Sequence, residues 1–158
     1  MKYVVVAVAA LAACGAQVAP GAPAPEATEL GVPQTGLEAV QLTISSANGA
    51  HRFEVEVAAT PEQQQHGMMF RTALAPDRGM IFPLEQVRPA SFWMRNTLIP
   101  LDIIFIRADG TIARIATARP LDDSPVPSGE PVAAVLEIAG GRAAELGIAA
   151  GDRVEWGR

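Results

Sequence analysis

The sequence holds very few of the residues that build disulfides and metal centres. Its 158 residues include one cysteine, Cys14, and two histidines, His51 and His66. A single cysteine excludes an intramolecular disulfide. A zinc site needs three or four cysteine, histidine or carboxylate ligands at fixed spacings, and two histidines 15 residues apart do not supply them. We therefore expect neither a metal site nor another cofactor.

Positive charge is also scarce. The chain has 12 lysine and arginine residues against 17 aspartate and glutamate residues, and its formal net charge is −5. Proteins that bind nucleic acid normally carry a basic face, so we expect no nucleic-acid partner. With 49% hydrophobic and 18% charged residues, the chain has enough apolar residues for one packed domain.

No apolar run reaches the roughly 20 residues needed to cross a bilayer, but the chain begins with a shorter one. Lys2 precedes an unbroken apolar run over residues 3–13, which is the form of a secretory signal peptide. The run ends in "LAAC", which resembles the bacterial lipobox. The resemblance implies that Cys14 carries acyl chains, and lipidation would explain a lone cysteine in an exported protein. An ordinary leader that leaves a free thiol is the alternative.

Three segments are therefore predicted along the chain. Residues 1–14 form a lipoprotein-type signal peptide, and residues 15–38 form a flexible tether, because 15–36 are rich in Ala, Pro and Gly and show no apolar period. Residues 39–158 form the folded domain. The expected location is the periplasm or cell envelope, with the membrane as a partner. Gly15 in place of Asp after the cysteine favours the outer membrane in a cell that has one.

The domain alternates apolar and polar residues in short runs separated by turn signals. Asn48-Gly49 and Asp109-Gly110 each lie between two such runs and predict β-hairpins. Thr60, Pro61 and Gln63 predict the capped start of a short helix on which His66 would be exposed, and a second helix is expected within 140–147. Strands are predicted over 40–46, 51–59, 79–84 (stopped by Pro83), 101–108, 111–118, 132–139 and 152–156, with a loop over 119–131. The expected fold is mainly β: a compact antiparallel sandwich or jelly-roll-like domain, or a partly open barrel.

Several blocks resemble one known family. "GMMFR", "DRGMIF", "FWMRNTLIPLDIIFI" and "AVLEIAGGRAAELGIAAGDRVEW" occur in this order over most of residues 60–156, and together they are similar to the bacterial and archaeal family DUF192. The resemblance implies a compact β-sandwich or jelly-roll-like architecture, often in exported proteins. It implies no particular activity, because none is established for the family.

The block "FWMRNTLIPLDIIFI" supplies the candidate binding residues. Trp93 offers a flat apolar face and Arg95 a fork of donors, which suits a sugar, a carboxylate or a peptide terminus. Asn96 and Asp102 lie in the same block, and Arg71 is a further candidate. The structural alternative is a polar loop held by its own hydrogen bonds, with Asp102 paired to Arg71 or Arg95.

These residues leave three functions open. The first is a non-catalytic binding or assembly module of the envelope with a shallow polar-aromatic site, whose partner would be an envelope protein or a glycan. The second is a hydrolase or transferase acting on glycans or peptides, with Asp102 or Glu137 as acid or base. The third is PDZ-like peptide binding, because "AAELGIAAGDRV" resembles the closing helix-to-strand segment of PDZ domains. We find no catalytic constellation in the sequence, so the first is favoured.

Overall fold

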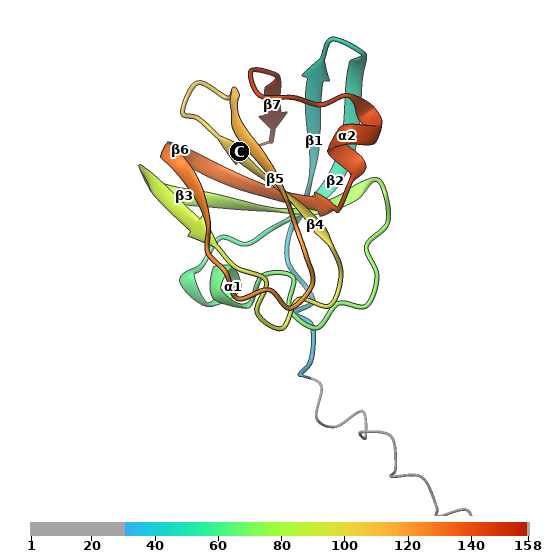
Figure 1. Cartoon of the computed structure of the whole chain (residues 1–158), viewed down its shortest axis with the longest axis vertical. Helices are drawn as coiled ribbons and strands as arrows, with labels where there is room; N and C mark the ends of the chain where they lie inside the picture. Colours follow the sequence, from blue (N-terminus) through green and yellow to red (C-terminus); the bar gives the residue numbers. More distant parts are fainter. Residues whose placement is uncertain (1–30, 158) are drawn as a thin grey trace, which may run out of the picture.

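The computed structural model describes residues 31–157, which contain seven strands and two short helices (Figure 1). The strands are β1 (Ala39–Ser46), β2 (Gly49–Val57), β3 (Arg78–Phe92), β4 (Leu101–Ile106), β5 (Ile112–Ala118), β6 (Val126–Ala139) and β7 (Arg153–Trp156). The helices are α1 (Pro61–His66) and α2 (Arg142–Leu146). The expected mainly β fold with two short helices is confirmed.

The seven strands form one curled sheet in the order β5-β4-β6-β3-β2-β1-β7. Neighbouring strands are antiparallel except β2 and β3, which are parallel. The two ends of the sheet meet, because Thr111 beside β5 forms a bridge with Arg153 of β7. The Ile112 amide also donates to the Asp152 carbonyl at 2.8 Å. The result is a half-barrel, and both predicted hairpins, β1–β2 and β4–β5, are present.

The long strands β3 and β6 correct two predictions. We expected β3 to stop at Pro83 and residues 119–131 to form a loop. Instead, β3 continues to Phe92 and pairs with a β6 that already begins at Val126. The ladder shifts register between Pro83 and Arg88 and again between Pro89 and Ser91. Prolines lack an N–H donor and are tolerated in sheets where regular pairing is interrupted, so they bend these strands without ending them.

Two hydrophobic cores lie on the two faces of the central strands. The first takes residues from all seven strands and from α2, so it fills the inside of the curl. The second covers the other face of β3, β4 and β6 and includes Met68 and Met94 from the adjoining loops. Every residue of β4 is buried, with Ile104 in the first core and Ile103 in the second. The pocket described below is built on the second face.

The signal peptide, Cys14 and most of the predicted tether lie outside the described residues. Residues 31–38 form neither helix nor strand, but they are in contact with the domain. The Gln34 side-chain amide donates to the carbonyls of Gln63 (3.1 Å) and Gly67 (2.8 Å), and Leu37 packs against the second core. Packing against the domain therefore begins before residue 39.

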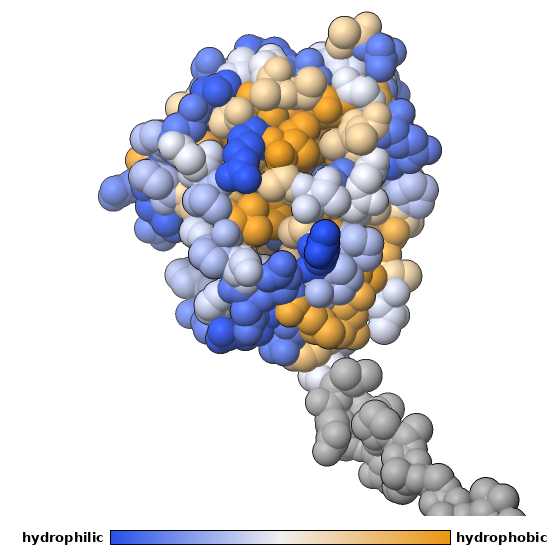
Figure 2. All heavy atoms as spheres, viewed as in Figure 1, coloured by the Kyte–Doolittle hydropathy of each residue, from blue (hydrophilic) through white to orange (hydrophobic). Residues whose placement is uncertain are grey.

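The surface of the described part is mixed. On the face shown in Figure 2, hydrophobic residues lie in the centre and along the lower right edge, between areas of hydrophilic residues. Within residues 31–157, no helix has the length and apolar character needed to cross a membrane.

Candidate functional site

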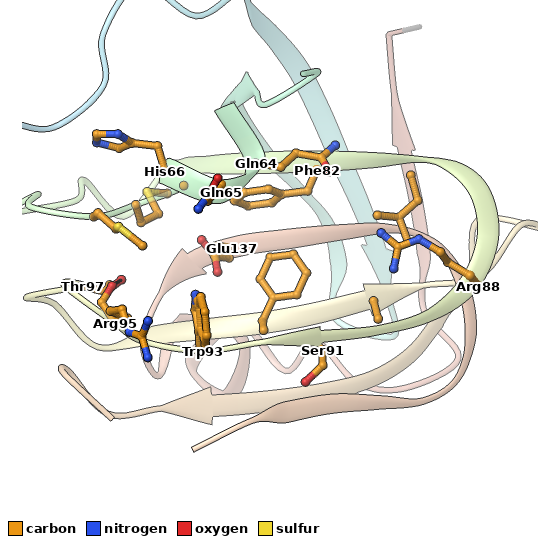
Figure 3. Close-up of a pocket in the computed structure, with 16 residues that line it drawn as sticks. Gln64, Gln65, His66, Phe82, Arg88, Ser91, Trp93, Arg95, Thr97 and Glu137 are labelled. Atoms are coloured by element: carbon orange, nitrogen blue, oxygen red, sulfur yellow. Dashed lines mark hydrogen bonds between the residues drawn. The ribbon is translucent and has the colours of Figure 1, made fainter. Parts of the chain in front are cut away.

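A pocket of about 260 Å³ lies between α1 and the bent strands β3 and β6 (Figure 3). We call it the α1 pocket. Its lining combines apolar, aromatic and polar side chains from α1, the residues that follow it, β3, the β3–β4 loop and β6. They are Gln64, Gln65, His66, Gly67, Met68, Met69, Phe82, Leu84, Arg88, Ala90, Ser91, Phe92, Trp93, Arg95, Thr97 and Glu137.

Helix α1 is held over the sheet by hydrogen bonds at both ends and on its inner side. Thr60 and Gln63 form the predicted capping box, and Gly67 ends the helix with a positive φ of 50°. The Gln64 amide donates to the carbonyls of Ala58 (3.1 Å) and Pro83 (2.8 Å). These bonds fix α1 to strands β2 and β3, so this side of the pocket is already formed without a ligand.

Glu137 lies at the floor of the α1 pocket. Its side chain leaves β6 on the same face as Val135, toward the second core, and only 4% of the residue is exposed. Figure 3 shows the carboxyl group pointing into the space between Gln65 and Trp93. No described residue donates a hydrogen bond to it. Burial raises the pKa of Glu137 from 4.5 to about 8, against the lowering effect of the Arg71 charge, so the group is mostly uncharged at neutral pH.

Arg71 acts on Glu137 from outside the pocket. Glu56, Met80 and Glu137 are paired in one row across β2, β3 and β6. Arg71 lies above this row, with Nη2 2.5 Å from Glu56 Oε2 and 3.2 Å from the Gln34 carbonyl. Arg71 was a candidate binding residue, but its side chain does not line the α1 pocket. Its guanidinium instead favours the charged form of Glu137 at a distance.

Trp93 and Arg95 stand at one end of the pocket, as a pair. The Arg95 guanidinium carbon lies 4.3 Å from the centre of a Trp93 ring, and Arg95 Nε is 3.4 Å from an oxygen of the exposed Asp123. Trp93 is 45% exposed. Both residues also line a neighbouring hollow of about 390 Å³ together with Asn96. Three of the five candidates therefore lie together at this end of the molecule.

Unusual backbone conformations also gather at this end. Phe70, Asn96 and Leu121 have positive φ angles of 65°, 55° and 59°, which is uncommon for residues with bulky side chains. Backbone hydrogen bonds connect the loops that carry them: Phe70 N–H donates to the Asn96 carbonyl (2.8 Å), and Leu121 N–H donates to the Thr97 carbonyl (3.0 Å). Strained backbone of this kind is often found at functional sites. Here the three strained residues lie in loops that are hydrogen-bonded to one another beside the pocket.

Asp102 has a structural role in a different part of the molecule. Asp102 was a candidate binding residue, with pairing to Arg71 or Arg95 as its structural alternative, and the pairing with arginine is wrong. Its carboxylate accepts hydrogen bonds from the Gly141 amide (2.9 Å), the Ala143 amide (2.8 Å) and the Thr117 hydroxyl (2.6 Å). Gly141, the N-cap of α2, has no side chain to offer. Asp102, 1% exposed, therefore caps α2 from strand β4 and does not line the α1 pocket.

His66 was expected to be exposed, and this is also wrong. The residue is half-buried at the wall of the pocket, its ring meets the edge of Phe70, and its Nε2 is buried without a hydrogen-bond partner among the described residues.

Sequence reasoning missed His66, Phe82 and Phe92 as pocket residues. Of the pocket residues named here, only Glu137 at the floor was marked by the sequence, because it is the lone carboxylate within the apolar strand "VAAVLEIA". Among the described residues, no group of three or more His, Cys, Asp or Glu is placed to hold a metal ion.

Two solved structures of proteins with substantial sequence identity to this chain have the same fold. A Sinorhizobium meliloti 1021 protein described as "a putative transcription regulator" is 40% identical, with a TM-score of 0.75 over 78% of this chain and 97% of its own. A protein of unknown function from Novosphingobium aromaticivorans DSM 12444 is 46% identical, with a TM-score of 0.76 over 85% of this chain and 100% of its own. No curated protein matches.

The family model DUF192, described as "Uncharacterized ACR", matches residues 42–156. This range includes α1, the bent strands β3 and β6 and the pocket between them. The resemblance seen in the sequence blocks is therefore confirmed, and the PDZ-like alternative rests only on the local segment from α2 to β7. The chain belongs to the DUF192 family.

Proposed function

We propose that this chain is a lipid-anchored binding or assembly module of the bacterial cell envelope, which holds a small ligand in the α1 pocket without converting it. The observation that carries the proposal is Glu137, a residue only 4% exposed whose carboxyl group faces an open pocket and receives no hydrogen bond from any residue of the described range 31–157. Buried polar groups are normally hydrogen-bonded, because leaving one unsatisfied costs about 1–3 kcal/mol. A ligand that pairs with Glu137 would supply the hydrogen-bond partner that the described residues do not.

The walls of the pocket support a binding role. Phe82 and Phe92 meet edge to face, with ring centres 5.1 Å apart, and they give the pocket a rigid apolar side. Trp93 and Arg95 give its mouth an aromatic face and a charged donor. Binding sites are commonly concave and mostly apolar, with a few polar groups that fix the orientation of the ligand.

Retention of small molecules tests this function. We expect the full chain, incubated with a small-molecule extract of cell envelopes and then separated by size, to retain one or a few compounds detectable by mass spectrometry. Glu137→Leu should retain at least tenfold less of them, because it removes the polar floor. Arg153→Gln, which disrupts only the exposed pair with Glu155, should behave as the native chain does. Equal retention by the native chain and Glu137→Leu would contradict the proposal.

The proposed anchor has its own test. We expect the native chain, labelled in cells with a radioactive or alkyne-bearing fatty acid, to take up label and to sediment with membranes. Cys14→Ser should take up none and should accumulate as the uncleaved precursor. Labelling of Cys14→Ser at the native level would exclude Cys14 as the lipidated residue.

Acid–base catalysis is the second candidate, and one observation favours it. Glu137, with its pKa raised to about 8, and His66, with an unpartnered Nε2, line the same pocket. Perturbed carboxyl groups beside a second titratable group are common in active sites. The extract experiment separates the two functions: an enzyme consumes compounds in large excess over the protein, whereas a binding module retains them unchanged.

A further inference from the structure

The charges around the α1 pocket point to the class of ligand. Arg88 and Arg95 line the pocket, and Figure 3 places them at its opposite ends. Among residues 31–157, the Arg88 side chain forms no ion pair, and its one hydrogen bond is a 3.4 Å contact with the Pro89 carbonyl. Arg95 has a weak, exposed partner in Asp123. Each end of the pocket therefore has a guanidinium group available to a negatively charged ligand.

The floor of the pocket offers a donor and not a negative charge. Glu137 is the only acidic residue among those that line the pocket. Because burial keeps it mostly protonated at neutral pH, it presents an O–H group to the cavity. A carboxylic acid kept neutral in an apolar site can donate a hydrogen bond to a ligand oxygen. A cationic ligand would meet an arginine at each end of the pocket and no full negative charge at the floor.

The lining and the volume of the pocket limit the polarity and the size of the ligand's central part. Between the arginines and Glu137 the surface is formed mainly by Met68, Phe82, Leu84, Ala90 and Phe92. The volume of about 260 Å³ lies just below the range typical of drug-sized ligands. One ring with a short side chain, or a branched aliphatic group, is of suitable size.

We infer that the α1 pocket binds a small organic acid, with its carboxylate held by Arg88 or Arg95, its apolar body against Phe82 and Phe92, and an oxygen accepting a hydrogen bond from Glu137. The inference rests on the proposed function, since it names the ligand class of the same pocket. It predicts that affinity falls as pH rises through the pKa of Glu137.

Other charged or titratable groups lie around the pocket or beside the strand row of Glu137, and their effects must be separated from that of Glu137. They are His66 from α1, Arg71 from the loop that follows, Glu56 from β2, and Arg88 and Arg95 from the two ends of the pocket. His66 is the one histidine among them, and histidine is the residue type whose ordinary charge change lies near neutral pH. His66→Gln is therefore the control for the pH dependence: it should leave the fall in affinity above about pH 7 unchanged.

Three probes with the same apolar body test the inference on the full chain: 3-(4-methoxyphenyl)propionate, its neutral amide, and 3-(4-methoxyphenyl)propylammonium. The methoxy oxygen can accept the hydrogen bond from Glu137 while the carboxylate contacts an arginine. We expect calorimetry at about pH 6 to show tightest binding for the carboxylate, and the affinity to fall roughly 30-fold by about pH 9.5, because only the protonated fraction of Glu137 is competent. The Glu137→Gln variant keeps a hydrogen-bond donor that cannot ionise, so it should bind the carboxylate probe at both pH values. At least one of the variants Arg88→Gln and Arg95→Gln should lower the affinity for the carboxylate probe at least fivefold and leave the affinity for the amide probe unchanged.

Two results would overturn the inference in different ways. Tighter binding of the ammonium probe would show that the pocket binds another class of ligand, and tighter binding of the carboxylate as pH rises would show that protonated Glu137 is not its hydrogen-bond donor. No binding by any of the three probes would also reject the organic-acid class. The proposed binding function is then judged by the retention experiment, which uses no assumption about charge.

Discussion

Glu137→Gln should raise the free energy of unfolding at pH values above 8 by about 5 kcal/mol. The pKa of Glu137 is raised from 4.5 to about 8 by burial, so between these values the folded chain binds a proton that the unfolded chain has already released. The free energy of unfolding therefore falls as pH rises through this window, and the loss is complete above pH 8. Gln is similar in shape and cannot ionise, so the variant avoids the loss.

Urea unfolding at several pH values between about 5 and 9 measures this effect. We expect the native chain to lose stability over this range and the difference from Glu137→Gln to grow with pH. Asp109 and Asp122 have lowered pKa values because of hydrogen bonds with Thr111 and Ser124, respectively. Their contributions are lost only on acidification below their ordinary range, so they do not interfere.

Two further variants complete this experiment. Arg71→Gln removes the charge that lowers the pKa of Glu137, so the loss of stability should extend to higher pH. Glu155→Gln, at an exposed position, should leave the pH dependence unchanged. A native chain equally stable at pH 5 and pH 8, with Glu137→Gln no different from it, would show that Glu137 is ionised at little cost.

Asp102→Ala should lower the free energy of unfolding by about 3–5 kcal/mol at neutral pH. The substitution leaves two backbone amides at the start of α2 and the Thr117 hydroxyl without their acceptor. Hydrogen bonds to a charged group contribute about 1.5–3 kcal/mol each, and buried donors left unpaired are costly. Because α2 is only five residues long, it has little stability of its own without this cap.

Thr117→Val is the matched control for Asp102. It removes the one hydrogen bond that comes from outside α2, and it should cost about 1 kcal/mol. Asp102→Ala that remains folded should bind the 3-(4-methoxyphenyl)propionate probe as the native chain does, because Asp102 does not line the α1 pocket. A folded Asp102→Ala with native stability and lost ligand binding would show that Asp102 is a binding residue after all.

The sequence by itself determined the local structure. Alternating runs around Asn48-Gly49 and Asp109-Gly110 predicted two hairpins, and Thr60 with Gln63 predicted the capped start of α1, because these signals act within a few residues. The block around Trp93 and Arg95 was identified for the same reason, since the two residues that stack are two positions apart. The extent of β3 and β6 was not predictable, because their prolines are accommodated by shifts in pairing between distant strands.

The tertiary structure alone decided which residues form the site. Glu137 and His66 are 71 positions apart and line one pocket only because α1 is fixed over β3 and β6. Asp102 appeared in the same block as Trp93, yet strand β4 directs it to the amides of α2, 39 and 41 residues away. Burial, which sets the pKa of Glu137, depends on how all these elements pack. Short-range patterns specify the elements, whereas the chemistry of a buried group depends on neighbours that the sequence brings together only on folding.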